Sequence, residues 1–159
     1  MSAGSLIASA VAIIMIVVAA YAVIGGTLVT AEVVADAQSD QVRQQEARLH
    51  TAIAIVGHTI DAGASTLYLD VENTGSETIL AFDEMAVFTL AGGSAPVYHA
   101  YEDGGGSGTW SWLSIEPDTV HPHALDPGEV MNLSVRYDGA APEWAQVTTP
   151  NGVYDSAYL

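Results

Sequence analysis

The sequence predicts an α+β chain in which one long N-terminal hydrophobic helix precedes an all-β antiparallel sandwich of the immunoglobulin type, with about seven to eight short strands. No charged residue occurs from Met1 to Ala31. Near His50 the spacing of apolar residues changes from helical to alternating, and turn-forming residues then recur about every 8 to 12 positions. We therefore expect a helix and stalk over residues 1–49 and a sandwich over 50–159, with a small barrel as the alternative.

The apolar run from Leu6 to Ile24 reads LIASAVAIIMIVVAAYAVI. It matches the about 20 residues that cross a bilayer as a helix, and it has no polar face of the kind that a surface helix of a soluble protein shows. A cleaved signal peptide is the alternative, but it would need a basic first region, and the chain starts with the uncharged MSAGS. We expect lipid, or copies of this helix, to cover Leu6, Ile7, Val11, Ile13, Ile14, Ile16, Val17, Val18, Tyr21, Val23 and Ile24.

The segment Thr27–Leu49 is polar but contains neither Gly nor Pro, so we expect a single helix from about Ser5 to about Arg48. Its second half forms a stalk, which is either a solvated helix beside the membrane or a packing surface. Between the two halves, Gly25-Gly26 would allow a neighbouring helix to approach closely in a membrane or a bundle.

The charge of the chain is strongly acidic. Nineteen Asp and Glu residues face three Arg and no Lys, for a net charge of −16, and there is no Cys. This balance argues against a nucleic-acid partner, which requires a basic surface, and against docking on anionic lipid. Disulfides and thiolate metal sites are excluded. The domain must therefore rely on its hydrophobic core, and its acidic surface suits a salty medium.

The alternation of apolar and polar residues predicts where the strands of the sandwich lie. In the first strand, Thr51, Ile53, Ile55 and Gly57 share one face and Ala52, Ala54, Val56 and His58 the other. After the turn Asp61-Ala62-Gly63, the residues Leu67, Leu69 and Val71 face inward and Tyr68, Asp70 and Glu72 outward. Further strands are expected at Ile79–Phe82, Met85–Leu90, Val97–Tyr101, Trp110–Ile115, Val130–Tyr137, Trp144–Thr148 and Val153–Leu159.

The strand Val130–Tyr137 alternates most clearly, with Met131, Leu133, Val135 and Tyr137 predicted to be buried and Asn132, Ser134 and Arg136 to face solvent. Asn132-Leu133-Ser134 is also an N-x-S sequon, so Asn132 is a candidate for N-glycosylation.

Catalysis and cofactor binding find little support in the sequence. His121-Pro122-His123 could bind a transition metal, but no third ligand follows at a fixed spacing. Acidic residues gather at Asp83-Glu84 and Glu102-Asp103, and Asp126 lies near Glu129, but there is no D-x-D-x-D pattern for Ca²⁺. No serine lies in a G-x-S-x-G context. We predict no enzyme activity, no catalytic or metal residues and no cofactor.

An uncharged N-terminal helix before a β-sandwich resembles the archaellin superfamily, the archaeal flagellins and their accessory proteins. The resemblance covers nearly the whole chain and is carried by a strand ending in an N-T-G-S turn, a later P-G-E turn and a terminal N-G turn. The residues concerned are Asn73, Thr74 and Gly75, then Pro127 and Gly128, then Asn151 and Gly152.

Archaellins carry a short basic leader that a peptidase removes, and no basic residue precedes the apolar run here. The chain therefore looks more like the membrane-anchored F and G accessory proteins of the superfamily. The resemblance implies a structural, stator-like component that crosses the cell membrane once, with its N-terminus inside. The sandwich would lie outside and bind the envelope (S-layer) or archaellum proteins, and homo-oligomers are expected.

Two alternatives stay open. One is an archaellin-like or type IV pilin-like subunit of an extracellular filament that polymerises through the helix. The other is a membrane-tethered binding domain unrelated to motility.

Overall fold

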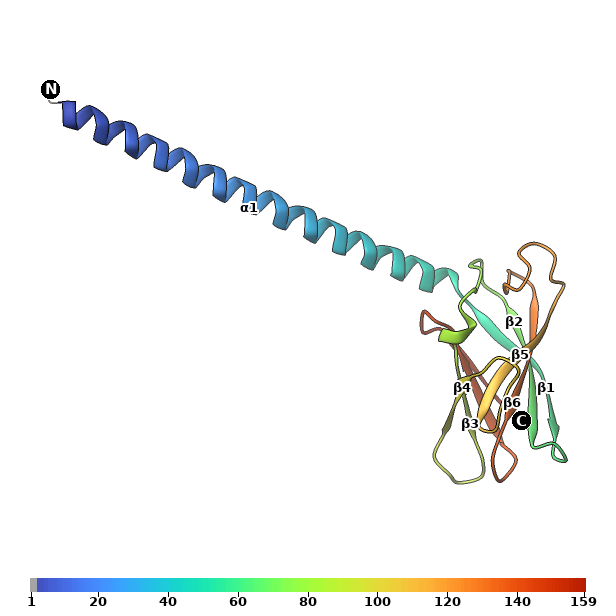
Figure 1. The fold of residues 1–159 in the computed structure, drawn as a ribbon. Coiled ribbons are helices and arrows are strands. Elements are labelled where there is room, and N and C mark those ends of the chain that lie inside the picture. Colours follow the sequence, from blue (N-terminus) through green and yellow to red (C-terminus); the bar gives the residue numbers. More distant parts are fainter. Residues whose placement is uncertain (1–2) are drawn as a thin grey trace. The chain divides into compact units, whose positions relative to one another are not determined.

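The computed structural model describes the backbone of residues 3–159 and all side chains in that range except those of residues 3, 5, 6 and 25–32. The expected Leu6 side chain and the close approach at Gly25-Gly26 lie outside the described side chains. The chain divides into two units, Met1–Arg43 and Gln44–Leu159. The first unit belongs to the helix α1, Ala3–His50, which matches the predicted span within the usual uncertainty of helix ends (Figure 1).

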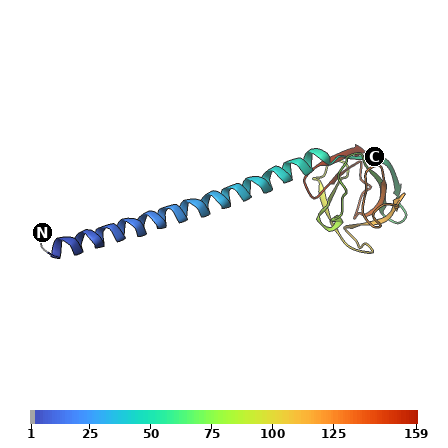
Figure 2. The same ribbon diagram turned by 90° about the horizontal axis from the view of Figure 1, so that it is seen from above.

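The second unit contains eight strands in the order β1-β2-β6-β5-β4-β3-β7-β8. Neighbouring strands are antiparallel except for β4 and β5, which pair in parallel. The edge strands β1 and β8 approach each other, and the Ile55 N–H donates to Asp155 Oδ2 at 2.8 Å. The strands thus wrap around a single core, as Figure 2 shows from above. They are β1 Ile53–Asp61, β2 Thr66–Asn73, β3 Ala86–Leu90, β4 Val97–Tyr101, β5 Thr109–Glu116, β6 Val130–Arg136, β7 Trp144–Thr148 and β8 Tyr154–Tyr158.

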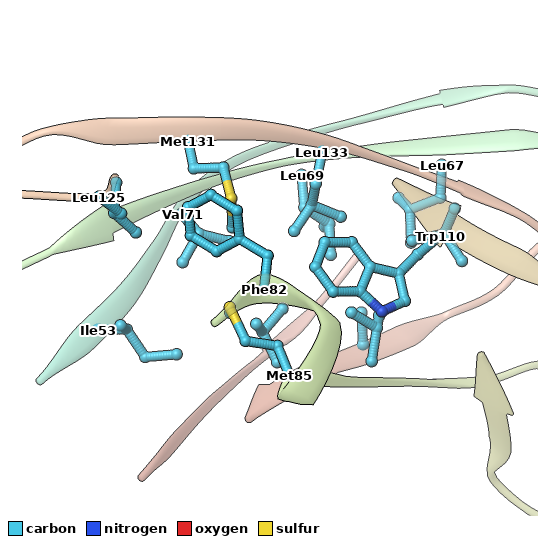
Figure 3. Packing of buried hydrophobic residues seen from close by; sticks show 14 of the residues in the cluster. Ile53, Leu67, Leu69, Val71, Phe82, Met85, Trp110, Leu125, Met131 and Leu133 are labelled. Atoms are coloured by element: carbon cyan, nitrogen blue, oxygen red, sulfur yellow. The ribbon is translucent and has the colours of Figure 1, made fainter. Parts of the chain in front are cut away.

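The fold class predicted from the sequence is therefore confirmed, as an almost closed sandwich. The predicted inward faces of β2 and β6 are the centre of its core: Leu67, Leu69, Val71, Met131, Leu133 and Val135 are fully buried. Trp110, Phe82 and Met85 fill the space between the sheet halves (Figure 3). Each buried side chain of this size contributes about 1.5–3 kcal/mol relative to exposure, so this core can support a domain that has no Cys.

One expected strand is wrong. Ile79–Phe82 is not a strand, because Ile79 forms only an isolated bridge with Leu125 and Phe82–Glu84 form the 3₁₀ helix η1. The Phe82 ring packs against Trp112, with ring centroids 6.2 Å apart. The apolar residues of this segment therefore plug the core instead of extending the sheet.

The predicted alternation of the first strand is wrong after Ile55. A bulge lies between Ile55 and Gly57, so that Ile55 pairs with Val71 while His58 pairs with Leu69. Residues that pair directly point to the same side of a sheet, so His58 shares the side of Ile55 rather than the outer one. An extra residue in one strand shifts its parity in this way, and Val56 is left 53% exposed.

Candidate functional site

The first part of the site is the apolar segment of α1. Ile7–Ile24 has a mean hydropathy of 2.8, is long enough to cross a membrane by length and composition, and none of it is buried within the structure. Its 18 residues extend about 27 Å at the helical rise, close to the about 30 Å of a hydrocarbon core. The large apolar side chains predicted for this segment are exposed, from 50% at Val11 to 81% at Tyr21. They are Ile7, Val11, Ile13, Ile14, Ile16, Val17, Val18, Tyr21, Val23 and Ile24.

Charged residues begin at Glu32, eight positions after Ile24. Asp36, Asp40 and Arg43 follow on the same helix, and all three are exposed. Among the stalk side chains that the structure describes, the large apolar ones are Val33, Val34, Val42 and Leu49, which are between 49% and 85% exposed. The helix therefore changes from an uncharged segment of bilayer length to a polar one.

The second part of the site lies within Gln44–Leu159, where α1 ends and β1 begins. The last turn of α1 contains Arg48 and His50, whose positive charge, when present, interacts favourably with a helix C-terminus. Thr51, only 5% exposed, donates to the Ala47 carbonyl from both its N–H, at 3.0 Å, and its hydroxyl, at 2.8 Å. The helix end is thus fixed by a buried threonine that sequence reasoning did not single out.

The N-T-G-S turn caps the helix end. Ser76 N–H donates to the His50 carbonyl at 2.8 Å, and Thr74 and Gly75 N–H both donate to the Ala52 carbonyl at 3.0 Å. Carbonyls at a helix C-terminus lack partners within the helix, and this turn supplies them. A methyl group at Gly75 would lie 2.5 Å from both Ala52 N and His50 O, so only glycine fits there.

The P-G-E turn holds the N-T-G-S turn in place. Asn73, which is fully buried, donates through Nδ2 to the Leu125 carbonyl at 2.9 Å. The backbones of the two turns also bond, from Gly128 N–H to Asn73 O at 2.8 Å and from Asn73 N–H to Glu129 O at 3.0 Å. Gly128, which follows Pro127 in this turn, has a φ of +82°, a conformation that glycine adopts without strain.

The N-G turn reaches the same place from the other side. Asn151 Nδ2 donates to Thr51 Oγ1 at 2.6 Å, and Gly152, with a φ of +81°, completes the turn. A cavity of about 210 Å³ lies beside it, lined by Ala47, Thr51, Ile79 and Asn151 among others. The three turns identified in the sequence therefore lie together near His50–Ala52, although they are far apart along the chain. We call these three turns and residues 50–52 the junction.

Asp126 and Glu129 accept hydrogen bonds beside this junction. Asp126 Oδ1 accepts from Thr78 Oγ1 at 2.8 Å, and Oδ2 accepts from His121 N–H at 2.9 Å. The His121 ring also lies 2.9 Å from Oδ1. Glu129 Oε2 accepts from the Asp126 N–H at 3.1 Å. The hydrogen bond from the His121 side chain, followed by those from Thr78 and the His121 backbone, lowers the pKa of Asp126 below its usual value.

We expect Asp126 to make the fold acid-sensitive. Because the folded state lowers its pKa, its contribution to stability is complete above the unfolded value of about 3.9 and is lost as the pH falls through the folded pKa. Asp126→Asn should therefore lower the melting temperature at neutral pH and flatten its decline below about pH 4. Thermal unfolding of the full chain in detergent measures both.

Asp103→Asn, at an exposed carboxyl, is the matched control and should show the same acid-dependent decline as the parent. A decline for Asp126→Asn that runs parallel to that of the parent would contradict this role of Asp126.

The other candidate residues are not brought together. The His123 ring lies against Trp112, with centroids 5.8 Å apart, and does not join His121. Asn132 Nδ2 donates to Asp70 Oδ1 at 2.6 Å. His99 is buried against Thr89, at 2.8 Å from Nε2 to Oγ1, and burial lowers its pKa. Among the described residues, no three His, Cys, Asp or Glu side chains are grouped to hold a metal.

Comparisons with known proteins identify a family for this chain. The family model for archaeal-type flagellin matches residues 3–158. No curated protein matches significantly.

Three solved structures have a similar fold. The archaellum periplasmic stator protein FlaG from Sulfolobus acidocaldarius has a TM-score of 0.52 at 20% identity, over 69% of this chain and 99% of that one. The archaellum periplasmic stator complex of FlaF and FlaG from the same organism has a TM-score of 0.51 at 19% identity, over 67% of this chain and 87% of that one. The archaeal flagellum of Methanospirillum hungatei has a TM-score of 0.54 at 18% identity, over 96% of this chain and 90% of that one.

Proposed function

The chain belongs to the archaeal-type flagellin family, and from this premise we propose that it is a non-enzymatic structural component of the archaellum, anchored in the cell membrane like a stator protein. Its apolar helix would cross the membrane once with the N-terminus inside. The sandwich would lie outside and bind the envelope (S-layer) or other archaellum proteins.

The observation that carries this proposal is the length of the strongly apolar segment of α1. The segment Ile7–Ile24 suits one bilayer crossing, and the helix then becomes polar and exposed at Asp36, Asp40 and Arg43. A helix buried along its whole length in a filament would have to bury these charges, and each unpaired buried charge is costly. A membrane leaves them in water.

The junction supports the same function. Hydrogen bonds to His50, Thr51 and Ala52 from two separate turns, N-T-G-S and N-G, join the end of α1 to the sandwich, and the P-G-E turn holds the first of these turns in place. An anchoring protein needs such a joint, because a load on the sandwich must reach the membrane helix without unfolding the connection.

A filament subunit is the second candidate, and one observation favours it. The family match includes the helix, and so does the likeness to the flagellum of M. hungatei, which extends over 96% of this chain. In that case copies of the chain, instead of lipid, would cover the apolar segment.

Fractionation of cells that produce the chain separates the two candidates. We expect the chain in the membrane fraction, released by detergent but not by a high-salt wash, and absent from filaments sheared off the cells. An abundant chain in detergent-free sheared filaments would instead establish the filament subunit. Cells that lack the chain and still swim normally would contradict both candidates.

A further inference from the structure

The strands β4, β3, β7 and β8 form one half of the sandwich and carry an uncharged outer surface. Phe88 lies between Tyr98 and Gln146 in register, and Trp144 lies between Leu90 and Tyr158. The other outward positions are Ala, Ser, Thr and Tyr residues. Within residues 33–159, whose side chains are all described, no charged side chain points outward from these four strands. We call this surface the neutral face.

The neutral face exposes aromatic side chains to solvent. Tyr98, Tyr154 and Tyr158 are 54%, 62% and 84% exposed, and the Phe88 and Tyr98 rings lie 5.4 Å apart. Uncharged aromatic side chains that are grouped on one exposed face of a sheet are typical of an interaction site. Aromatic residues are also enriched at the centres of interfaces, where charged residues are depleted.

The other half of the sandwich is acidic on its outer surface. Asp70 and Glu72 point outward from β2, and Glu116 points outward from β5. All acidic residues except Glu32, Asp36, Asp40 and Glu46 lie after residue 50, where Arg136 is the one Arg or Lys. Two copies of such a domain repel each other in most orientations. They can meet through the neutral face without burying like charges.

We propose that the neutral face is the contact between the sandwiches of two copies of this chain. The proposal rests on the proposed function, because both of its candidates hold copies of the helix together, in one membrane or in one bundle. At the usual strand spacing and rise, the face measures about 19 by 17 Å, whereas each partner in a standard interface buries about 800 Å². The contact is therefore weak by itself and forms when the helices hold copies in one membrane or bundle, at a high effective concentration.

Cross-linking of the full-length chain in membranes tests this contact. The chain has no Cys, so Ser156→Cys places a single thiol on the neutral face, at an exposed position of β8. Thr59→Cys is the matched control at an exposed position on the outer side of β1. With a short bis-maleimide we expect covalent dimers to form several times faster from the first variant than from the second. Equal rates would overturn the proposal.

A charge in the face gives an independent readout. Tyr158→Glu, added to Ser156→Cys, should slow the cross-link markedly, and Thr59→Glu in the same background should not. Tyr158 is 84% exposed, so the variant is expected to fold, which near-ultraviolet circular dichroism checks. A cross-link that Tyr158→Glu leaves unchanged would overturn the contact. If cross-linking contradicts the contact but cell fractionation finds the chain in the membrane, the proposed function is retained and only the contact is rejected.

Discussion

Leu133→Asp is expected to unfold the sandwich at room temperature. Leu133 is fully buried in the central strand β6, between Leu69 of β2 and Trp112 of β5. A carboxylate at that position would have no partner, and an unpaired buried charge costs several kcal/mol, while a domain of this size has a free energy of unfolding of about 5–15 kcal/mol. Near-ultraviolet circular dichroism and tryptophan fluorescence, which report on the buried Trp110, measure the loss.

Ser134→Asp is the matched control, because it places the same charge one residue further along the same strand. Ser134 points outward, is half-buried, and lies 3.3 Å from the Ser111 hydroxyl, which can donate to a new carboxylate. We expect a decrease in stability of about 1 kcal/mol or less. Equal melting temperatures for the two variants would contradict the assignment of the two faces of β6.

Gly75→Ala is expected to produce the second-largest loss, through the junction. The added methyl group would lie 2.5 Å from Ala52 N and His50 O, which are backbone atoms and cannot swing away as a side chain can. The turn must shift, and its hydrogen bonds to the Ala52 carbonyl lengthen. Overpacking of this kind costs about 1–3 kcal/mol or more, which denaturant unfolding of the full chain in detergent would measure.

Gly63→Ala is the corresponding control in an exposed turn. Its methyl group would lie 3.3 Å from the Asp61 carboxylate oxygen, a side-chain atom that can move. We expect little change in its unfolding midpoint. A Gly75→Ala variant as stable as Gly63→Ala would show that the turn can shift without cost, and would contradict the requirement for glycine at position 75.

The fold could be predicted from the sequence wherever local periodicity determines burial. The alternation of Met131, Leu133 and Val135 predicts one buried face, which the structure confirms. The apolar run from Leu6 to Ile24 predicts a helix, which the structure also confirms. The bulge at Val56 could not be foreseen, because an inserted residue changes parity without changing composition. Ile79 and Phe82 were misassigned because an apolar residue that plugs a core looks like one that lies in a strand.

The junction was harder to predict because its contacts join segments distant in sequence. Asn73, Gly128 and Asn151 stood out as turn residues, but nothing in the sequence indicates that their turns meet. Thr51 and Asp126 gave weaker signals still. A threonine after a helix and an aspartate before a Pro-Gly pair are common, and only the hydrogen bonds from Asn151 and Thr78 reveal what they stabilise.

The junction has a mechanical consequence. A force applied to His50 does not pass to β1 alone, because the Asn73–Ser76 turn holds the His50 and Ala52 carbonyls while Asn151 holds Thr51. These bonds carry load in parallel, so tension is shared between β1, the turn after β2 and the turn after β7. Parallel bonds must break together, whereas bonds in series open one at a time. The joint is accordingly built to resist twisting and pulling, and its mechanical yield point should lie above that of the β1–β8 edge, where Ile55 N–H to Asp155 is the hydrogen bond that spans the two strands within the described residues.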